Sequence, residues 1–215
     1  QNKKSWDHSS KLKIITHHWG NNWNKGFDVY CYIDKLLDES NFSEKFEFTY
    51  VGNLPKNFSF KNVSYKKPLS GIKLSEELKA NDLYITGSLN EPSGNHQIEA
   101  SLCGLPVLYI NSGGIPEYQK NFGIEFEINN LNEKFEEIYK NYDSYYKKNE
   151  NFPYNSELMC ESYLDIMKSI YDPKLDTKKI GLYMYIYRFL NYFNFLLIFK
   201  SFLANLIYQF RKLRS

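Results

Sequence analysis

The stretch from residue 87 to residue 117 constrains the fold of this chain more than any other part of its sequence. It reads GSLNEPSGNHQIEASLCGLPVLYINSGGIPE and follows a short apolar run at 82–86 that ends at a glycine. Such a run is typical of a buried strand. A loop comes next, then a helix that Ser93 or Asn95 can cap, then an apolar run at 107–110. Strand, helix and strand in this order predict a parallel βαβ unit.

Small residues follow both of these predicted strands. The backbone amides of Ser93, Gly94 and Asn95 lie at the expected helix N-terminus, where they can hold an anionic phosphate. Gly94 and the pair Gly113 and Gly114 lack side chains, so the backbone can approach a ligand closely. Because open α/β sheets bind ligands outside the carboxyl ends of their strands, we expect a phosphate-bearing ligand here.

Two carboxylates accompany this expected phosphate site. Pro92 disfavours helix at Glu91, which places Glu91 on the loop beyond the strand, while Glu99 lies on the helix. A phosphate repels carboxylates, so each must face another group, and sugar hydroxyls are natural hydrogen-bond donors to them. A phosphate flanked by two polyols describes a nucleotide sugar. The alternative is that Glu99 only complements the helix dipole and Glu91 is a solvated loop residue.

These residues resemble the donor-binding signature of GT-B retaining glycosyltransferases, in particular glycosyltransferase family 4. That signature has two glutamates around a small glycine loop, followed by Gly-x-Pro-Val and Gly-Gly-x-Pro-Glu. The matching positions here are Glu91, Gly94, Glu99 with Ala100, residues 104–107 and residues 113–117. The resemblance extends over roughly residues 11–171 and implies the C-terminal, donor-binding half of such an enzyme.

The loop after the first predicted strand carries a further match. The family has a Lys-Gly pair there whose lysine contacts the donor diphosphate, and Lys25 and Gly26 match that pair. The arginine that usually precedes it is missing, and His17, His18 or nearby asparagines are expected to substitute for it. Lys25 as a solvated loop lysine and the two histidines as structural residues are the alternatives.

The resemblance also implies roles for these residues. Glu91 holds hydroxyls of the transferred sugar, Glu99 holds the nucleotide ribose, and Lys25 with the amides of residues 93–95 neutralises the diphosphate leaving group. His96 and Gln97 are candidates for the lining of the sugar pocket. GT-B enzymes generally act without a metal, and the sequence has no Asp-x-Asp motif. We therefore expect no cofactor and no metal.

The order of apolar runs predicts the architecture. Strands are expected at 13–16, 46–51, 63–65, 82–86, 107–110 and 124–128, with helices between most of them. This alternation predicts an α/β fold with a doubly wound parallel sheet in the order 3-2-1-4-5-6, the Rossmann-like half of a GT-B fold. Three segments are expected: a linker or disordered segment over 1–10, the nucleotide-sugar-binding domain over 11–172 and an amphipathic aromatic helical tail over 173–215.

The tail is a second distinctive part of the sequence. Residues 178–215 are strongly apolar and aromatic, with a narrow polar stripe at helical spacing and a basic end, Arg-Lys-Leu-Arg. This pattern favours a helix that lies in a membrane interface, and it is too interrupted to predict a transmembrane span. Packing against an N-terminal domain or a partner chain is the alternative.

Composition excludes some functions and favours a compartment. A net charge of +2 gives no indication of nucleic-acid binding. The three cysteines have neither disulfide nor metal spacing, which favours the cytoplasm. The tail adds the expectation of peripheral attachment to the inner face of a membrane. No Gly-x-Gly-x-x-Gly follows the first strand, which argues against a nicotinamide dehydrogenase.

Two functions are the main candidates, and a sugar-nucleotide epimerase of GT-B-like fold, which would also need its other half, stays open beside them. The first is the donor-binding half of a retaining hexosyltransferase that transfers sugar to a glycan or lipid-linked acceptor in polysaccharide or lipopolysaccharide biosynthesis. Its acceptor domain is expected either on an N-terminal part that this sequence does not include or on a partner chain. The second is a non-catalytic nucleotide-sugar-binding module that requires a partner chain. Donor binding is common to both, and turnover separates them.

Overall fold

The computed structural model describes residues 5–170 together with 185, 186 and 189. The chain divides into two compact units, residues 1–159 and residues 160–215. The predicted helical tail over 173–215 lies almost wholly outside the described residues, so it stays a prediction, as do the three predicted segment boundaries.

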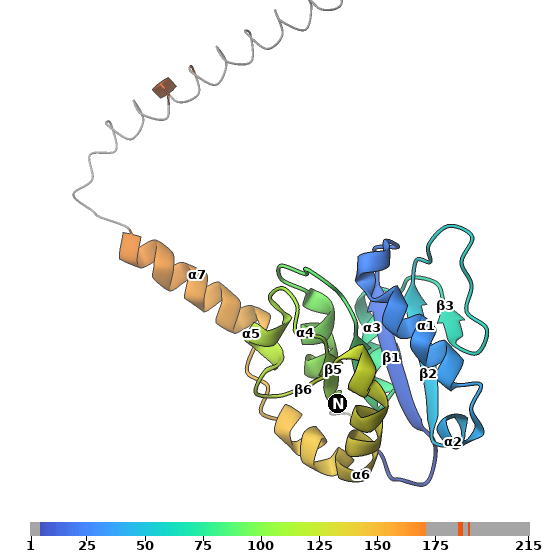
Figure 1. The fold of residues 1–215 in the computed structure, drawn as a ribbon. Helices are drawn as coiled ribbons and strands as arrows, with labels where there is room; N and C mark the ends of the chain where they lie inside the picture. Colours follow the sequence, from blue (N-terminus) through green and yellow to red (C-terminus); the bar gives the residue numbers. More distant parts are fainter. Residues whose placement is uncertain (1–4, 171–184, 187–188, 190–215) are drawn as a thin grey trace, which may run out of the picture. The chain divides into compact units, whose positions relative to one another are not determined.

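Six parallel strands form one sheet in the order β3-β2-β1-β4-β5-β6, as the sequence predicted (Figure 1). The strands are β1 Leu12–His18, β2 Phe46–Gly52, β3 Ser64–Lys66, β4 Leu83–Thr86, β5 Val107–Tyr109 and β6 Ile124–Glu125. Strands β4 and β5 are buried throughout and consist mostly of apolar residues, which is the usual pattern of a parallel sheet. Strands β2 and β3 are added on one side of β1, and β4, β5 and β6 on the other. The loops after β1 and β4 therefore lead to opposite faces of the sheet and leave room for a ligand between them.

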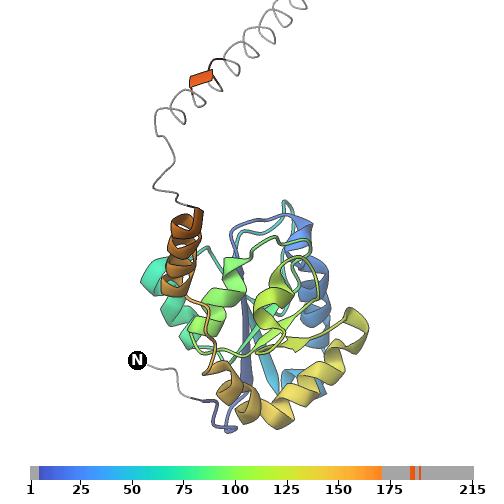
Figure 2. The same cartoon turned by 90° about the vertical axis from the view of Figure 1, so that its left-hand side faces the viewer.

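Helices cover both faces of the sheet (Figure 2). The α-helices are α1 Phe27–Leu36, α2 Ser40–Ser43, α3 Gly71–Lys79, α4 Asn95–Leu102, α5 Ile115–Gln119, α6 Leu131–Asn149 and α7 Ser156–Ile170, with short 3-10 helices at η1 Trp23–Lys25 and η2 Ile128–Asn130. Side chains of α1 and α6 belong to one buried core and those of α3, α4 and α5 to another. The protein thus has the three layers of an α/β fold.

Two local predictions were wrong. Helix α4 begins at Asn95 with Gly94 as its N-cap, and neither Ser93 nor Asn95 caps it with a side chain. The strand expected at 124–128 ends at Glu125, because the chain turns into η2 three residues later. The short helix α5 after the double glycine was not predicted at all. Its proline lies in the first turn, a position where proline stabilises a helix start.

The segment before β1 is anchored to the domain. The side chain of Trp6 is only 5% exposed. Its ring packs against Tyr139 and Tyr142 of α6 at centroid distances of 5.1 and 5.5 Å, and its indole N–H donates to the Ser10 carbonyl at 3.0 Å. Burial of one tryptophan therefore fixes a segment whose polar composition suggested a linker.

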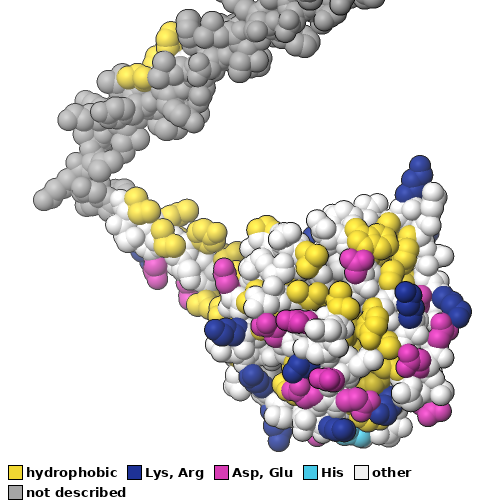
Figure 3. Space-filling view, viewed as in Figure 1, with side chains coloured by type: hydrophobic (Ala, Val, Ile, Leu, Met, Phe, Trp, Pro, Cys, Tyr) yellow, Lys and Arg dark blue, Asp and Glu magenta, His cyan; other side chains and the backbone are white. Residues whose placement is uncertain are grey.

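Charges of both signs are interspersed on the face drawn in Figure 3. That distribution agrees with the small net charge and offers no basic stripe for a nucleic acid. Helix α7 carries exposed apolar side chains, among them Tyr163, Met167 and Ile170. In the described part of the chain, no helix is both long enough and apolar enough to cross a membrane.

Candidate functional site

Three loops meet at the carboxyl edge of the sheet, after β1, β4 and β5. The loops after β1 and β4 touch, because a Cβ on Gly26 would lie 2.7 Å from the backbone of Gly87. The Leu89 N–H also donates to the Asn24 carbonyl at 2.8 Å. Gly26 has a φ of 97°, a conformation that favours glycine. These contacts bring the predicted lysine loop beside the predicted glutamate loop.

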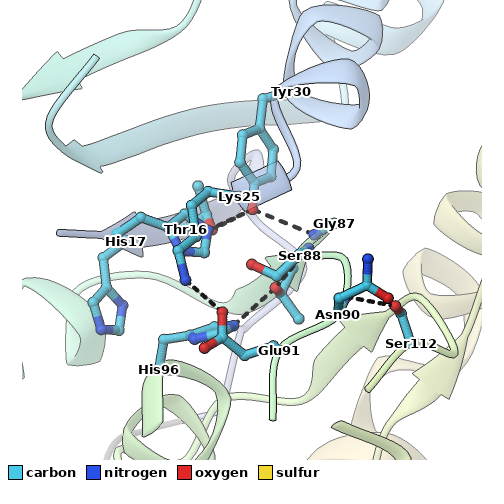
Figure 4. A network of polar contacts seen from close by, with 12 residues as sticks. Thr16, His17, Lys25, Tyr30, Gly87, Ser88, Asn90, Glu91, His96 and Ser112 are labelled. Atoms are coloured by element: carbon cyan, nitrogen blue, oxygen red, sulfur yellow. Dashed lines mark hydrogen bonds and ion pairs between the residues drawn. The ribbon is translucent and has the colours of Figure 1, made fainter. Parts of the chain in front are cut away.

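Lys25 and Glu91 form an ion pair across these two loops. The Lys25 Nζ lies 2.5 Å from the Glu91 Oε2, and the side chains are 24% and 17% exposed. Figure 4 shows the two side chains pointing toward each other. The sequence predicted both residues for the site, and the structure adds that each is the other's partner in the free protein. A partly buried pair of this kind is strong enough to orient both groups.

The backbone of Glu91 is held by the double glycine after β5. The Gly114 N–H donates to the Glu91 carbonyl at 2.8 Å, and a Cβ on Gly113 would collide with the same carbonyl. Gly113 also has a φ of 61°, which disfavours other residues. In the same pair of loops, the Asn90 N–H donates to the Ser112 Oγ at 2.8 Å. Gly113 and Gly114 therefore pack against the glutamate loop, where they fix Glu91.

Helix α4 begins beside this ion pair. A Cβ on Gly94 would lie 2.6 Å from the His96 Cε1 and 2.8 Å from the Glu91 Cγ, so a larger residue there would displace the side chains of the site. Ser93 and Asn95 are exposed on either side of Gly94. The first amides of a helix have no partner within the helix, and they carry its positive dipole end. These amides thus add to the positive charge that Lys25 supplies.

His96 is buried at the start of α4 and points back to the end of β4. Its Nε2 lies 2.9 Å from the Thr86 Oγ1. Burial, reinforced by His17 and Lys25 nearby, lowers the pKa of His96 to about 3. The imidazole is therefore neutral near neutral pH and cannot add a positive charge to the site.

His18 faces the interior rather than the loop edge. Its Nε2 lies 2.6 Å from the Tyr30 hydroxyl of α1, and that hydroxyl accepts from the Gly87 N–H at 3.3 Å. Burial holds the pKa of His18 well below its usual range. The sequence did not indicate Tyr30. Its hydroxyl links α1 both to His18 at the end of β1 and to Gly87 in the loop after β4. The predicted contact of His18 with substrate stays a prediction.

Glu99 lies on α4, and its partner is His17, which the sequence offered only as a substitute for the missing arginine. Its Oε2 is 3.0 Å from the Nε2 of His17, and the side chains of His17 and Glu99 are 7% and 48% exposed. Successive strand residues point to opposite faces, so His17 and His18 serve different layers. That alternation was the available signal, and it favours His17 as the histidine that reaches Glu99.

Further buried polar atoms lie in this region. The Ser88 Oγ and both polar atoms of the Gln97 side chain have no hydrogen-bond partner within the described chain. Buried polar groups are rarely left without partners, so these groups are candidates for contacts with a ligand or with water. Among the described residues, no three His, Cys, Asp or Glu side chains are arranged to hold a metal ion. The expectation that no metal is needed stays a prediction.

A known family matches part of this chain, and solved structures share its fold. Residues 59–159 match the family Glycosyl transferases group 1. Among solved structures, TarM superposes with a TM-score of 0.54 at 20% identity over 77% of this chain and 36% of its own. WaaG, a glycosyltransferase involved in lipopolysaccharide biosynthesis, gives 0.54 at 18% identity over 66% of this chain and 42% of its own. No curated protein matches the sequence.

A third structure is the C-terminal domain of the glycosyl transferase group 1 family protein LpcC from Francisella tularensis. It has a TM-score of 0.53 at 14% identity and covers 65% of this chain and 81% of its own. The chain thus spans less than half the length of TarM and WaaG, but most of an isolated C-terminal domain. These similarities confirm the predicted resemblance to GT-B glycosyltransferases and the Rossmann-like fold.

Proposed function

We propose that this GT-B glycosyltransferase domain binds a nucleotide sugar and forms the donor half of a glycosyltransferase. The observation that carries the proposal is the meeting of Lys25, Glu91 and the N-terminus of α4 at the carboxyl edge of the sheet. A cation, a hydroxyl-accepting carboxylate and unpaired amides side by side suit a sugar diphosphate better than either a free sugar or a free phosphate.

Each group then has a role in transfer. Negative charge develops on the diphosphate as its bond to the sugar breaks, and Lys25 with the amides of residues 93–95 stabilises that charge. Glu91 accepts hydrogen bonds from hydroxyls of the transferred sugar, and Glu99 accepts them from the nucleotide ribose. Gly113 and Gly114 keep Glu91 in place. No metal or cofactor takes part in this proposal.

The finer assignment follows the relatives. We infer a hexosyl transfer with retention of configuration to a glycan or lipid-linked acceptor in polysaccharide or lipopolysaccharide biosynthesis. WaaG, which is involved in lipopolysaccharide biosynthesis, supports this direction. The acceptor is proposed to bind to a further domain or partner chain, because the chain spans only 36% of TarM and 42% of WaaG. Contact of residues 178–215 with the inner face of a membrane belongs to the same proposal.

The same coverage supports a second function, a non-catalytic module that binds nucleotide sugars for a partner chain. It predicts the same donor contacts but no transfer. The two functions are separated by measuring nucleoside diphosphate release from UDP-, GDP- and ADP-sugars, with and without glycan acceptors.

Donor binding itself is tested first by thermal unfolding with each nucleotide sugar. A ligand at a hundred times its Kd stabilises a folded protein by about 2.7 kcal/mol, an easily measured shift. Wild type is expected to be stabilised by one donor class, and Lys25→Met to lose most of that stabilisation. Lys120→Met, which removes an exposed lysine just after α5, is the matched control. Stabilisation by no nucleotide sugar would contradict the proposal.

A further inference from the structure

Glu99 is held by a histidine from a different element. His17, the penultimate residue of β1, reaches across to α4, where its Nε2 lies 3.0 Å from the Glu99 Oε2. The histidine ring is almost fully buried, while about half of the glutamate side chain stays exposed. One carboxylate oxygen of Glu99 is thus held by the His17 ring, and the rest of the carboxylate is open to a ligand.

Tyr84 holds both the backbone and the ring of His17. The Tyr84 hydroxyl of β4 accepts from the His17 N–H and lies within donating distance of the His17 carbonyl, both at 3.3 Å. The ring of Tyr84 meets the imidazole edge-on at 5.5 Å. In Figure 4 the side chain of His17 points away from the Lys25–Glu91 pair. Its carboxylate partner is Glu99. A buried ring with its backbone held in this way has little freedom to turn.

The contact also fixes the proton on the ring. A carboxylate only accepts hydrogen bonds, so the His17 Nε2 must donate. The donated hydrogen bond removes rotamers from a glutamate that would otherwise move freely on a helix surface, where such side chains have much conformational entropy to lose on binding. A ligand that meets an already ordered carboxylate loses less freedom on binding and gains selectivity.

We propose that His17 is a positioning residue that holds Glu99 in the orientation in which it accepts hydrogen bonds from the ribose hydroxyls of the donor nucleotide. This inference rests on the proposed function, because it takes Glu99 as the ribose-binding residue. It predicts that His17 controls discrimination between ribose and deoxyribose without touching the nucleotide.

The test compares nucleotides that differ only in the sugar hydroxyls. Whichever of UDP, GDP and ADP binds wild type most tightly is titrated beside its 2′-deoxy and 3′-deoxy forms by calorimetry. A hydrogen bond to a charged group corresponds to roughly a tenfold preference or more, so wild type is expected to favour the ribonucleotide over at least one deoxy form by about that factor. His17→Leu is expected to remove most of this preference.

Three further variants make the test specific. The amide of His17→Gln can place an N–H near the former Nε2, so discrimination is expected to be partly restored. The amide of His17→Asn is too short to reach Glu99 and is expected to behave as His17→Leu does, which keeps the test valid if the leucine variant does not fold. Glu99→Gln is expected to lose the preference, and adding His17→Leu to it to change nothing more, because the two residues act as one unit.

The outcomes separate the two hypotheses. If wild type binds no nucleotide, the proposed function fails and this inference fails with it. If wild type binds and discriminates, but His17→Leu and His17→Asn weaken ribonucleotide and deoxynucleotide by the same factor, the proposed function stands. His17 would then be a structural residue only, and the positioning role would be overturned.

Discussion

Replacing Glu91 by glutamine is expected to tighten the binding of nucleoside diphosphate and to weaken transfer. In the free protein Lys25 is held by Glu91 at 2.5 Å. A diphosphate that uses Lys25 must first separate this pair and then sit near the remaining carboxylate. Glutamine keeps the shape and part of the hydrogen bonding of Glu91 but removes its charge, so the lysine becomes available to the ligand.

The size of the effect follows from the pair's geometry. At 2.5 Å and an effective dielectric constant of about 20, the attraction between two unit charges is roughly 7 kcal/mol. Most of it is offset when water or a phosphate replaces Glu91 around the ammonium group, which leaves a net cost of about 1–2 kcal/mol for a partly buried pair. Nucleoside diphosphate is therefore expected to bind about tenfold more tightly to Glu91→Gln.

The nucleotide sugar should not share this gain. Its sugar hydroxyls lose a charged acceptor, so the preference for nucleotide sugar over free nucleoside diphosphate is expected to fall, and transfer with it. Calorimetry with both ligands measures this ratio. Glu133→Gln, which removes an exposed carboxylate in the first turn of α6, controls for the change in net charge. An unchanged or weaker affinity of Glu91→Gln for nucleoside diphosphate, or an equal gain in Glu133→Gln, would refute the reasoning.

Three further predictions concern stability and the tail. Gly113→Ala is expected to lower the free energy of unfolding by more than the ~1–2 kcal/mol that an alanine in a left-handed conformation costs, because its Cβ also meets the Glu91 backbone. Urea unfolding should show a smaller loss for the control Gly71→Ala, because Gly71 has a φ of 58° but open space around it. Equal losses in the two variants would contradict the contact with Glu91. The pKa of His96 is about 3 in the folded chain and 6.5 ordinarily, so between pH 7 and pH 5 only the unfolded chain takes up a proton on this residue. The free energy of unfolding is therefore expected to be unaffected by His96 above pH 6.5 and to fall by about 2 kcal/mol at pH 5. Urea titrations should show a shallower fall in His96→Gln, and parallel curves would exclude the effect. In liposome flotation, removal of residues 178–215 is expected to abolish recovery with anionic vesicles, and equal recovery of both proteins would disprove membrane contact through the tail.

Much of the fold was predictable because the strands and helices of a parallel α/β sheet have distinct and easily recognised sequence patterns. Buried strands such as β4 are short apolar runs that end at glycine, and their alternation with amphipathic helices leaves few topologies. The burial of Trp6 was not predictable, since its partners on α6 are more than a hundred residues away. Helix α5 was missed because its five residues carry too little periodicity to be recognised.

The site was predicted residue by residue, but its pairings were not. Glycines and glutamates at fixed spacing indicated where Glu91 and Gly94 lie. The Lys25–Glu91 pair depends on two loops that touch through Gly26 and Gly87, a contact that no local pattern encodes. The sequence named His17 and His18 together, and the alternation of side chains along β1 gives His17 the contact with Glu99.

The central claim is that the carboxyl edge of this sheet binds the donor of a glycosyl transfer. Its most direct test is calorimetric titration of the whole chain with UDP-, GDP- and ADP-sugars, beside Glu99→Ala. The account predicts specific binding of one donor class, with affinity reduced at least about tenfold in the variant, as loss of a charged hydrogen-bond partner requires. Binding that Glu99→Ala retains in full would contradict the account.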